Sequence, residues 1–242
     1  MTNKIQVFVL THRSPYKSHI SHLSSLFRDP RYDYNVDSNS EDPLDKRILN
    51  CLQKSYSKNP DSYSLILTDR VLTAHSGKNV LSIIDNCIKH AKFDLAYLYK
   101  YNDKCQMHVK IKDCGHATIV KTQDPKGLDS ILYSPSGRDI LLAKKNSRIR
   151  ANCNKGIEKA VKKLGSAVTC ITTTPNVFSY DTLNNVVTCA GYNQGNECAP
   201  LQLDAIAKRI GDDRRSLIIF FLLVVVALLT YALLSMKYYC DP

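Results

Sequence analysis

The stretch from Leu217 to Met236 constrains this chain more than any other feature, because its twenty consecutive residues carry no charge. At the α-helical rise per residue, a helix of this length spans about 30 Å, which is the thickness of the hydrocarbon core of a bilayer. The sequence therefore predicts a C-terminal transmembrane helix. The residues expected to represent the membrane span are Leu217, Phe220, Phe221, Val225, Leu229, Leu233 and Met236.

The charges that flank this span predict the side of the membrane on which the rest of the chain lies. Lys208, Arg209, Arg214 and Arg215 precede the span, whereas only Lys237 follows it closely. Positive residues are retained on the cytoplasmic side and acidic residues contribute little, so we expect the large N-terminal part to face the cytoplasm. The first ten residues lack a small-residue cleavage site and are typical of a strand, not of a signal peptide.

The chain is basic, with 33 Lys and Arg against 22 Asp and Glu and a formal net charge of +11. Much of the excess falls between residues 144 and 163, where Glu158 is the only acid. Such a segment is typical of a solvated helix face, and it also suits contact with anionic lipid headgroups or an acidic protein partner. Nucleic acid is not the expected partner, because no aromatic residues are interleaved for base stacking. The expected basic contact patch consists of Lys144, Lys145, Arg148, Arg150, Lys155, Lys159, Lys162 and Lys163.

The nine cysteines do not by themselves predict a disulfide framework, because the expected compartment is reducing. We expect mostly free, buried thiols. Pairing stays open for Cys153, Cys170, Cys189 and Cys198, which fall in a stretch rich in Thr, Asn and Gly.

Two groups of residues contain side chains of the types that bind metal ions. Cys105, His108, Cys114 and His116 lie within twelve residues, but their spacing fits no common zinc finger, so ordinary packing is the favoured interpretation. A histidine pair one helical turn apart, His19 and His22, is expected on the surface.

Apolar spacing predicts alternating strands and helices over the first 100 residues. Continuous or alternating apolar runs favour strands, and apolar residues at three- and four-residue intervals favour helices. This order predicts an α/β layer with a largely parallel sheet. We expect strands at 4–10, 63–67 and 93–99, helices at 16–27, 44–56 and 79–90, and a polar loop at 28–43.

Three segments in this region follow one another in a suggestive order. Asp61–Val71 reads Asp-Ser-Tyr-Ser-Leu-Ile-Leu-Thr-Asp-Arg-Val, Phe93–Leu98 reads Phe-Asp-Leu-Ala-Tyr-Leu, and Ile131–Leu142 carries Ser-Pro-Ser-Gly before a Leu-Leu pair. Over residues 4–145 this order resembles the family 25 glycosyltransferases, the lipopolysaccharide and collagen galactosyltransferase type. The resemblance implies a nucleotide-sugar-transferase-like (GT-A-like) layered domain, whose strand Leu-Ile-Leu-Glu-Asp-Asp-Val ends at a metal site.

The chain departs from that family at the metal motif. Where the family carries Glu-Asp-Asp, this chain has Thr68, Asp69 and Arg70. A divalent metal bound beside a guanidinium would be repelled, so we expect metal-dependent sugar transfer to be lost and neither a metal nor another cofactor to be bound. In the alternative, Arg70 binds a diphosphate directly, as basic residues do in metal-independent transferases. Asp69 and Asp94 each also fit a strand-end cap.

Together these features predict three regions: a degenerate glycosyltransferase-like domain (1–150), a cysteine-containing extension (151–210), and the anchor with a short tail (211–242). In the extension we expect a helix at 151–164, a strand at 167–173 and a hairpin of 177–180 with 185–189.

The favoured hypothesis is a membrane-anchored, non-catalytic scaffolding protein whose partners are the lipid bilayer and protein neighbours in an assembly. In its small size, basic charge, C-terminal anchor and lack of tryptophan, the chain resembles minor capsid proteins of large DNA viruses. Such proteins link a capsid shell to an internal membrane, so the virion is a second expected location. The alternative is a membrane-bound glycosyltransferase that uses a nucleotide sugar without the usual metal motif.

Overall fold

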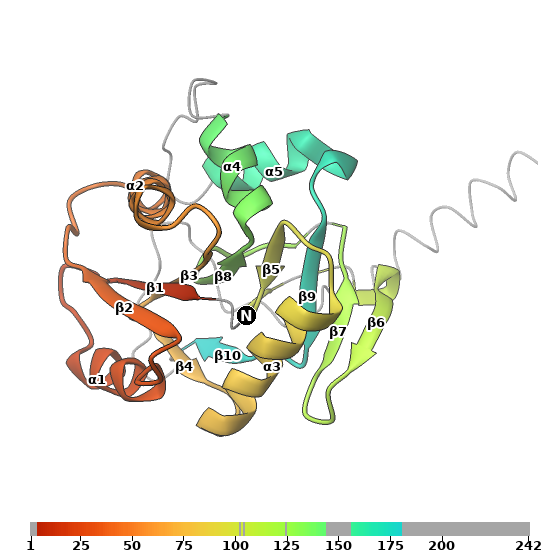
Figure 1. The fold of residues 1–242 in the computed structure, drawn as a ribbon, viewed down its shortest axis with the longest axis horizontal. Helices are drawn as coiled ribbons and strands as arrows, with labels where there is room; N and C mark the ends of the chain where they lie inside the picture. Colours follow the sequence, from red (N-terminus) through yellow and green to blue (C-terminus); the bar gives the residue numbers. More distant parts are fainter. Residues whose placement is uncertain (1–3, 102, 104, 124, 144–155, 181–242) are drawn as a thin grey trace, which may run out of the picture. The chain divides into compact units, whose positions relative to one another are not determined.

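The computed structural model describes residues 4–101, 103, 105–123, 125–143 and 156–180, all within the first of two compact units, Met1–Ala199. In this part of the chain, one sheet has the strand order β2-β1-β3-β8-β5-β9-β7-β6, and β4 pairs with β10 in a second sheet (Figure 1). The strands are β1 (Ile5–Leu10), β2 (Tyr32–Asp37), β3 (Tyr63–Thr68), β4 (Val71–Thr73), β5 (Leu95–Tyr97), β6 (Val109–Asp113), β7 (Thr118–Lys121), β8 (Ser130–Tyr133), β9 (Cys170–Thr174) and β10 (Phe178–Tyr180). The α-helices are α1 (Lys17–Leu26), α2 (Leu44–Lys58), α3 (Gly77–His90), α4 (Pro135–Ala143) and α5 (Gly156–Leu164).

Most strands of the large sheet run in one direction. β1 is parallel to β2 and β3, and β5 is parallel to β9. β8 is antiparallel to both β3 and β5, and β7 is antiparallel to β9 and β6. Only β8 and β7 therefore oppose the other strands of this sheet, so the expected α/β architecture with a largely parallel sheet is confirmed for the described residues.

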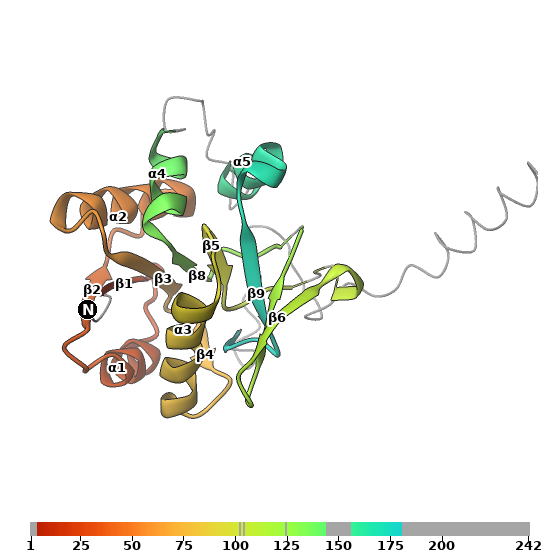
Figure 2. The same cartoon turned by 45° about the vertical axis from the view of Figure 1, so that its right-hand side comes forward.

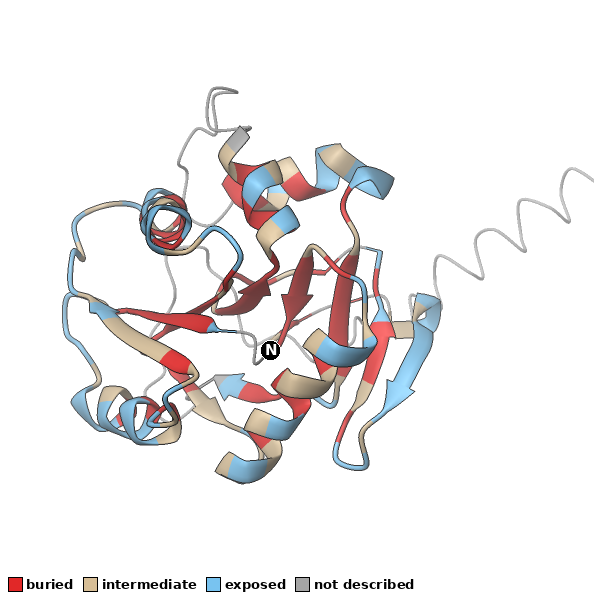
Figure 3. Cartoon of the chain, in the orientation of Figure 1, coloured by how far each residue is buried: buried red, intermediate tan, exposed pale blue. Residues whose placement is uncertain are grey.

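Helices cover both faces of the sheet because the central strands are apolar on both sides. In β1, Val7 and Val9 pack into one core cluster and Phe8 and Leu10 into the other. Both views show α1 and α3 on one side of the sheet and α2, α4 and α5 on the other (Figures 1 and 2). Figure 3 shows the contrast between the buried central strands and the exposed edge strand β6.

The helices and strands expected from apolar spacing in the first 100 residues are confirmed, with boundaries that differ by at most two residues. The expected polar loop at 28–43 is wrong, because β2 occupies part of it and pairs with β1. An edge strand is paired on one side only and half-exposed, so it needs few apolar residues. Its polar sequence, Tyr-Asp-Tyr-Asn-Val-Asp, therefore resembles a loop.

Residues 156–180 are part of the same architecture as the first 150 residues. β9 lies between β5 and β7 in the large sheet, and β10 pairs with β4. The buried Asp45 in α2 accepts hydrogen bonds from the backbone N–H groups of Gly156 and Ile157, at 3.1 and 3.0 Å, and so caps the start of α5. The expected hairpin partner of β10, residues 185–189, lies outside the described residues.

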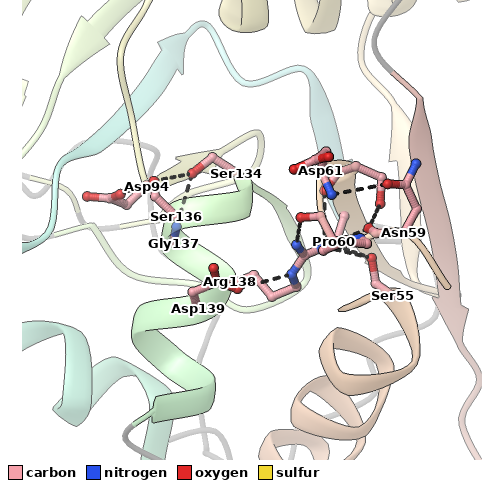
Figure 4. A network of polar contacts seen from close by, with 12 residues as sticks. Ser55, Asn59, Pro60, Asp61, Asp94, Ser134, Ser136, Gly137, Arg138 and Asp139 are labelled. Atoms are coloured by element: carbon pink, nitrogen blue, oxygen red, sulfur yellow. Dashed lines mark hydrogen bonds and ion pairs between the residues drawn. The ribbon is translucent and has the colours of Figure 1, made fainter. Parts of the chain in front are cut away.

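The Ser-Pro-Ser-Gly turn, Ser134 to Gly137, opens α4 (Figure 4). The Ser134 hydroxyl accepts a hydrogen bond from the Gly137 N–H at 3.1 Å, and the Ser136 hydroxyl donates to Asp94 at 2.6 Å. A Cβ on Gly137 would meet the carbonyl oxygen of Asp94 at 2.1 Å, so only glycine allows this close approach. Asp94 thus fixes the junction between β8 and α4.

Several expected features lie outside the described residues. These are the span Leu217–Met236 and the basic residues Lys144, Lys145, Arg148, Arg150 and Lys155. Among the helices that the structure does describe, none has the length and apolar character needed to cross a bilayer.

Candidate functional site

The residues of the degenerate motif lie at the carboxyl ends of two neighbouring parallel strands. Thr68 ends β3 and is the register partner of Leu10, which ends β1. Asp69 follows directly, and its N–H donates to the Leu10 carbonyl at 3.0 Å. In open α/β sheets the crevice outside such strand ends is where ligands bind, so this edge is the candidate site.

Asp69 is fully buried, and both of its carboxylate oxygens accept hydrogen bonds from the chain itself. Oδ2 accepts from the backbone N–H groups of His12, at 3.1 Å, and Tyr16, at 3.2 Å. Oδ1 makes a close contact with His12 Nδ1. The backbone carbonyl of Asp69 lies 3.0 Å from Nδ1 of the buried His19 in α1. Asp69 therefore ties β3 to α1 and to the loop that precedes it.

The electrostatic balance at Asp69 favours the ionised carboxylate. Burial acts to raise the pKa of Asp69, but the hydrogen bonds and charge of His12, together with the Tyr16 N–H, outweigh burial and hold the pKa below its usual value. The negative charge is thus stabilised by donors inside the fold.

A second carboxylate, Asp129, lies beside the motif. The Thr68 hydroxyl donates to Asp129 Oδ1 at 3.0 Å, and the Thr68 N–H donates to the Asp129 carbonyl at 2.9 Å. Asp129 directly precedes β8, whose antiparallel course brings its start to the carboxyl end of β3. Burial raises the pKa of Asp129, against the lowering effects of the Thr68 hydroxyl and the charges of His12 and Arg70.

The motif does not fit the divalent metal that the resemblance to the family 25 glycosyltransferases implies. The oxygens of Asp69 accept from nitrogen donors, the Thr68 hydroxyl donates to Asp129, and Arg70 is a cation next in the chain. A metal ion needs oxygen lone pairs directed at one point, which these residues do not offer. No grouping of three or more His, Cys, Asp or Glu side chains suited to a metal ion occurs among residues the structure describes.

The structure corrects one of the two histidine expectations and confirms the other. His19, expected on the surface, is buried against Asp69, because α1 packs its inner face over the end of β3. His22 is exposed, and its Nε2 lies 3.1 Å from the Thr73 hydroxyl.

Two of the four residues considered as zinc ligands, Cys105 and His108, have other partners. Cys105 is held in a disulfide, so its sulfur is not available as a thiolate. His108 Nε2 lies 2.8 Å from the buried carboxylate of Asp103. The expectation of free thiols is confirmed for four of the described cysteines, of which all but Cys114 are buried: Cys51, Cys87, Cys114 and Cys170.

The described end of the basic patch lies on the outer side of α5. Lys159, Lys162 and Lys163 are exposed, whereas Ile157 and Val161 are buried. The one acid of this segment, Glu158, accepts a hydrogen bond from the Gly127 N–H at 3.0 Å. The helix therefore presents lysines to solvent.

Sequence reasoning missed His12 and Asp129. Both are far from Thr68 and Asp69 in the chain, and only the sheet brings them together. A usable signal was present for His12, which lies two residues after the apolar run of β1, at the carboxyl end where parallel sheets bind ligands. Asp129 follows the polar segment 121–127 and carries no comparable signal.

No protein-family model matches the chain, and no curated protein matches it. Among solved structures, the chain is similar to the crystal structure of a glycosyltransferase involved in the glycosylation of the major capsid of PBCV-1. The sequence identity is 13%, the TM-score is 0.43, and the match covers 76% of this chain and 86% of that chain. A likeness at this level assigns neither a substrate nor a site residue to the chain.

Proposed function

We propose that this chain is a membrane-anchored, non-catalytic scaffolding protein built on a glycosyltransferase-like α/β domain. The observation that supports the proposal most strongly is the set of hydrogen bonds that the Asp69 carboxylate accepts. Its two carboxylate oxygens accept from His12 and Tyr16 inside the fold, where a transferase of this kind would direct them at a metal and a diphosphate. A buried residue with its hydrogen-bonding capacity used in this way serves the fold and not a ligand.

The membrane part of the proposal rests on the uncharged stretch Leu217–Met236 and the positive charges before it. In this arrangement the domain faces the cytoplasm, and its surfaces bind protein neighbours. A minor capsid protein that links a capsid shell to an internal membrane is the form of scaffold that we propose. The exposed lysines of α5 suit contact with anionic headgroups or an acidic neighbour.

The membrane anchor is tested by extraction of isolated membranes that carry the full chain. We expect alkali to leave the chain in the membrane fraction and detergent to release it. A variant that ends at Lys208 is the control, and we expect it to be released by alkali. Release of the full chain by alkali alone would refute the anchor.

The proposed loss of nucleotide-sugar binding is tested by calorimetric titration of the full chain in detergent with nucleotide sugars in the presence of Mn²⁺. We expect no saturable heat at micromolar ligand, because both carboxylate oxygens of Asp69 already accept from His12 and Tyr16 and Thr68 donates its hydroxyl to Asp129.

The alternative, a metal-independent membrane-bound transferase, is favoured by one observation. Asp129 and Arg70 interact electrostatically at the same strand end, and burial raises the pKa of Asp129, which is a property of general bases. Saturable micromolar binding of a nucleotide sugar, lost in Arg70→Ala and retained in the exposed control Arg13→Ala, would support this alternative and contradict the scaffold.

A further inference from the structure

A second candidate binding surface lies at the amino ends of the strands, whereas Asp69 lies at the carboxyl end of β3. Three adjoining cavities form there, with volumes of about 410, 460 and 700 Å³. The first lies at the amino ends of β1, β2 and β3, the second runs along the outer side of α3, and the third lies beside the amino ends of β3 and β5. Arg31 lines the first and second cavities and Lys89 lines the second and third, so we describe all three as one basal trough.

The basal trough has an excess of positive charge. Its lining contains six Lys and Arg residues but only three aspartates. Each aspartate already has partners: Asp33 pairs with Lys58 at 2.5 Å, and Asp85 pairs with Arg31 at 3.0 Å. Asp94 accepts from the Ser136 hydroxyl and from the Thr169 N–H.

Four exposed lysines remain along the basal trough, and none forms an ion pair with any residue that the structure describes: Lys4, Lys78, Lys89 and Lys92. Lys89 lies in the last turn of α3, where a cation also complements the helix dipole. That explanation does not extend to Lys4, Lys78 or Lys92, which lie outside this turn. Their charges are therefore available to an external anion.

The shape and chemistry of the basal trough distinguish between anionic partners. Asp94 accepts from neutral donors, so its charge on the lining would repel a continuous phosphodiester backbone. Of the lining aromatic residues, Tyr32 and Phe93 are 6% and 7% exposed and Tyr63 packs against Phe93, which leaves little ring surface for base stacking. An extended peptide whose acidic residues alternate with small polar residues can reach the lysines and avoid the aspartates.

We propose that the basal trough binds an extended acidic segment of a partner protein. The lysines supply the attraction, and hydroxyl and amide groups on the same lining, such as Ser82, Asn86 and Ser136, supply hydrogen bonds. The basal trough is separate from the Asp69 edge, so this proposal stands whether or not the domain binds a nucleotide sugar.

The test uses the full chain in nanodiscs of neutral phosphatidylcholine. The probe is a fluorescein-labelled peptide of six Glu-Ser repeats, and its fluorescence anisotropy is followed at low and at physiological salt. The trough variant is Lys89→Glu with Lys92→Glu. The matched control is Lys112→Glu with Lys121→Glu, which changes the net charge equally at exposed positions of β6 and β7, outside the trough and outside the α5 lysines.

We expect the wild-type chain to bind the peptide at low salt and to bind it more weakly as salt increases. The trough variant should bind about tenfold more weakly, because two attractions become repulsions, and the control should lose less than about twofold. Equal losses in both variants would overturn the proposal in favour of net charge alone. Absence of peptide binding, or stronger competition by an oligothymidylate of equal charge or by anionic vesicles, would also overturn it.

Discussion

Replacement of Arg138 by Met should destabilise the fold more than replacement of any exposed arginine. Arg138 is fully buried, and Figure 4 shows its guanidinium directed at the chain that follows α2. Nη1 donates to the Ser55 hydroxyl at 3.3 Å and to the Ser62 carbonyl at 3.1 Å, and Nη2 donates to the Pro60 carbonyl. The positive charge also lies where the carbonyl end of the α2 dipole is negative.

The size of the effect follows from what Met leaves behind. Met fills a similar space, but the carbonyls of Pro60 and Ser62 lose a charged donor, each at about 1.5–3 kcal/mol. Removal of a buried charge from the protein recovers part of this cost. We expect a net loss of about 3–4 kcal/mol, a large fraction of the 5–15 kcal/mol that is typical of a domain.

The assay is urea unfolding of the full chain in mild detergent, followed by near-ultraviolet circular dichroism of its 14 tyrosines, because the chain has no tryptophan. Arg13→Met, at an exposed position, is the control and should change the free energy of unfolding by no more than about 0.5 kcal/mol. Arg138→Lys should be intermediate, because an ammonium keeps the charge but cannot fork to several carbonyls. A value for Arg138→Met within about 1 kcal/mol of wild type would refute this role of the guanidinium.

Three further predictions use the same chain. The pKa of Asp69 is lowered in the folded state, so its ionised form stabilises the fold fully above its unfolded-state pKa of about 4, and this contribution is lost as the pH falls through the lower folded pKa. Asp69→Asn should therefore flatten the loss of stability below about pH 4 in urea titrations at several pH values, and an unchanged slope would count against the role of Asp69. Gly137→Ala should cost about 3 kcal/mol or more in urea unfolding, because its Cβ would overlap the Asp94 carbonyl, and a neutral result would contradict that packing. Peptide mass spectrometry after iodoacetamide treatment at pH 8 should show Cys114 labelled before the buried free thiols of Cys51, Cys87 and Cys170. Burial raises the pKa of each of these three thiols to about 12, and equal labelling rates would contradict their burial.

The sequence predicted those parts of the fold whose signal is local. α2 and α3 have apolar residues at helical spacing, and β1 and β3 are apolar runs, so each was recognisable by itself. β2 and β6 were missed because they are edge strands with little buried apolar surface: β2 is polar and only partly buried, and every residue of β6 is exposed. The position of β9 between β5 and β7 was not predictable, because strand pairing at this sequence separation leaves no local pattern.

The candidate site was predictable in location and not in chemistry. The strand that ends at Thr68 and Asp69 indicated the edge of the sheet, and the loss of two carboxylates was visible in the sequence. The contacts of His12 and Asp129 depend on side chains that meet across the sheet edge. Because of these contacts, Thr68 and Asp69 belong to a hydrogen-bond network inside the fold.

Electron paramagnetic resonance of Mn²⁺ added to the full chain tests most directly whether Asp69 serves the fold and not a metal. The proposed function predicts that wild type and Asp69→Asn leave the same free Mn²⁺ signal at micromolar concentrations, because His12 and Tyr16 already occupy the carboxylate. A free-ion signal that wild type depletes and Asp69→Asn restores would contradict it.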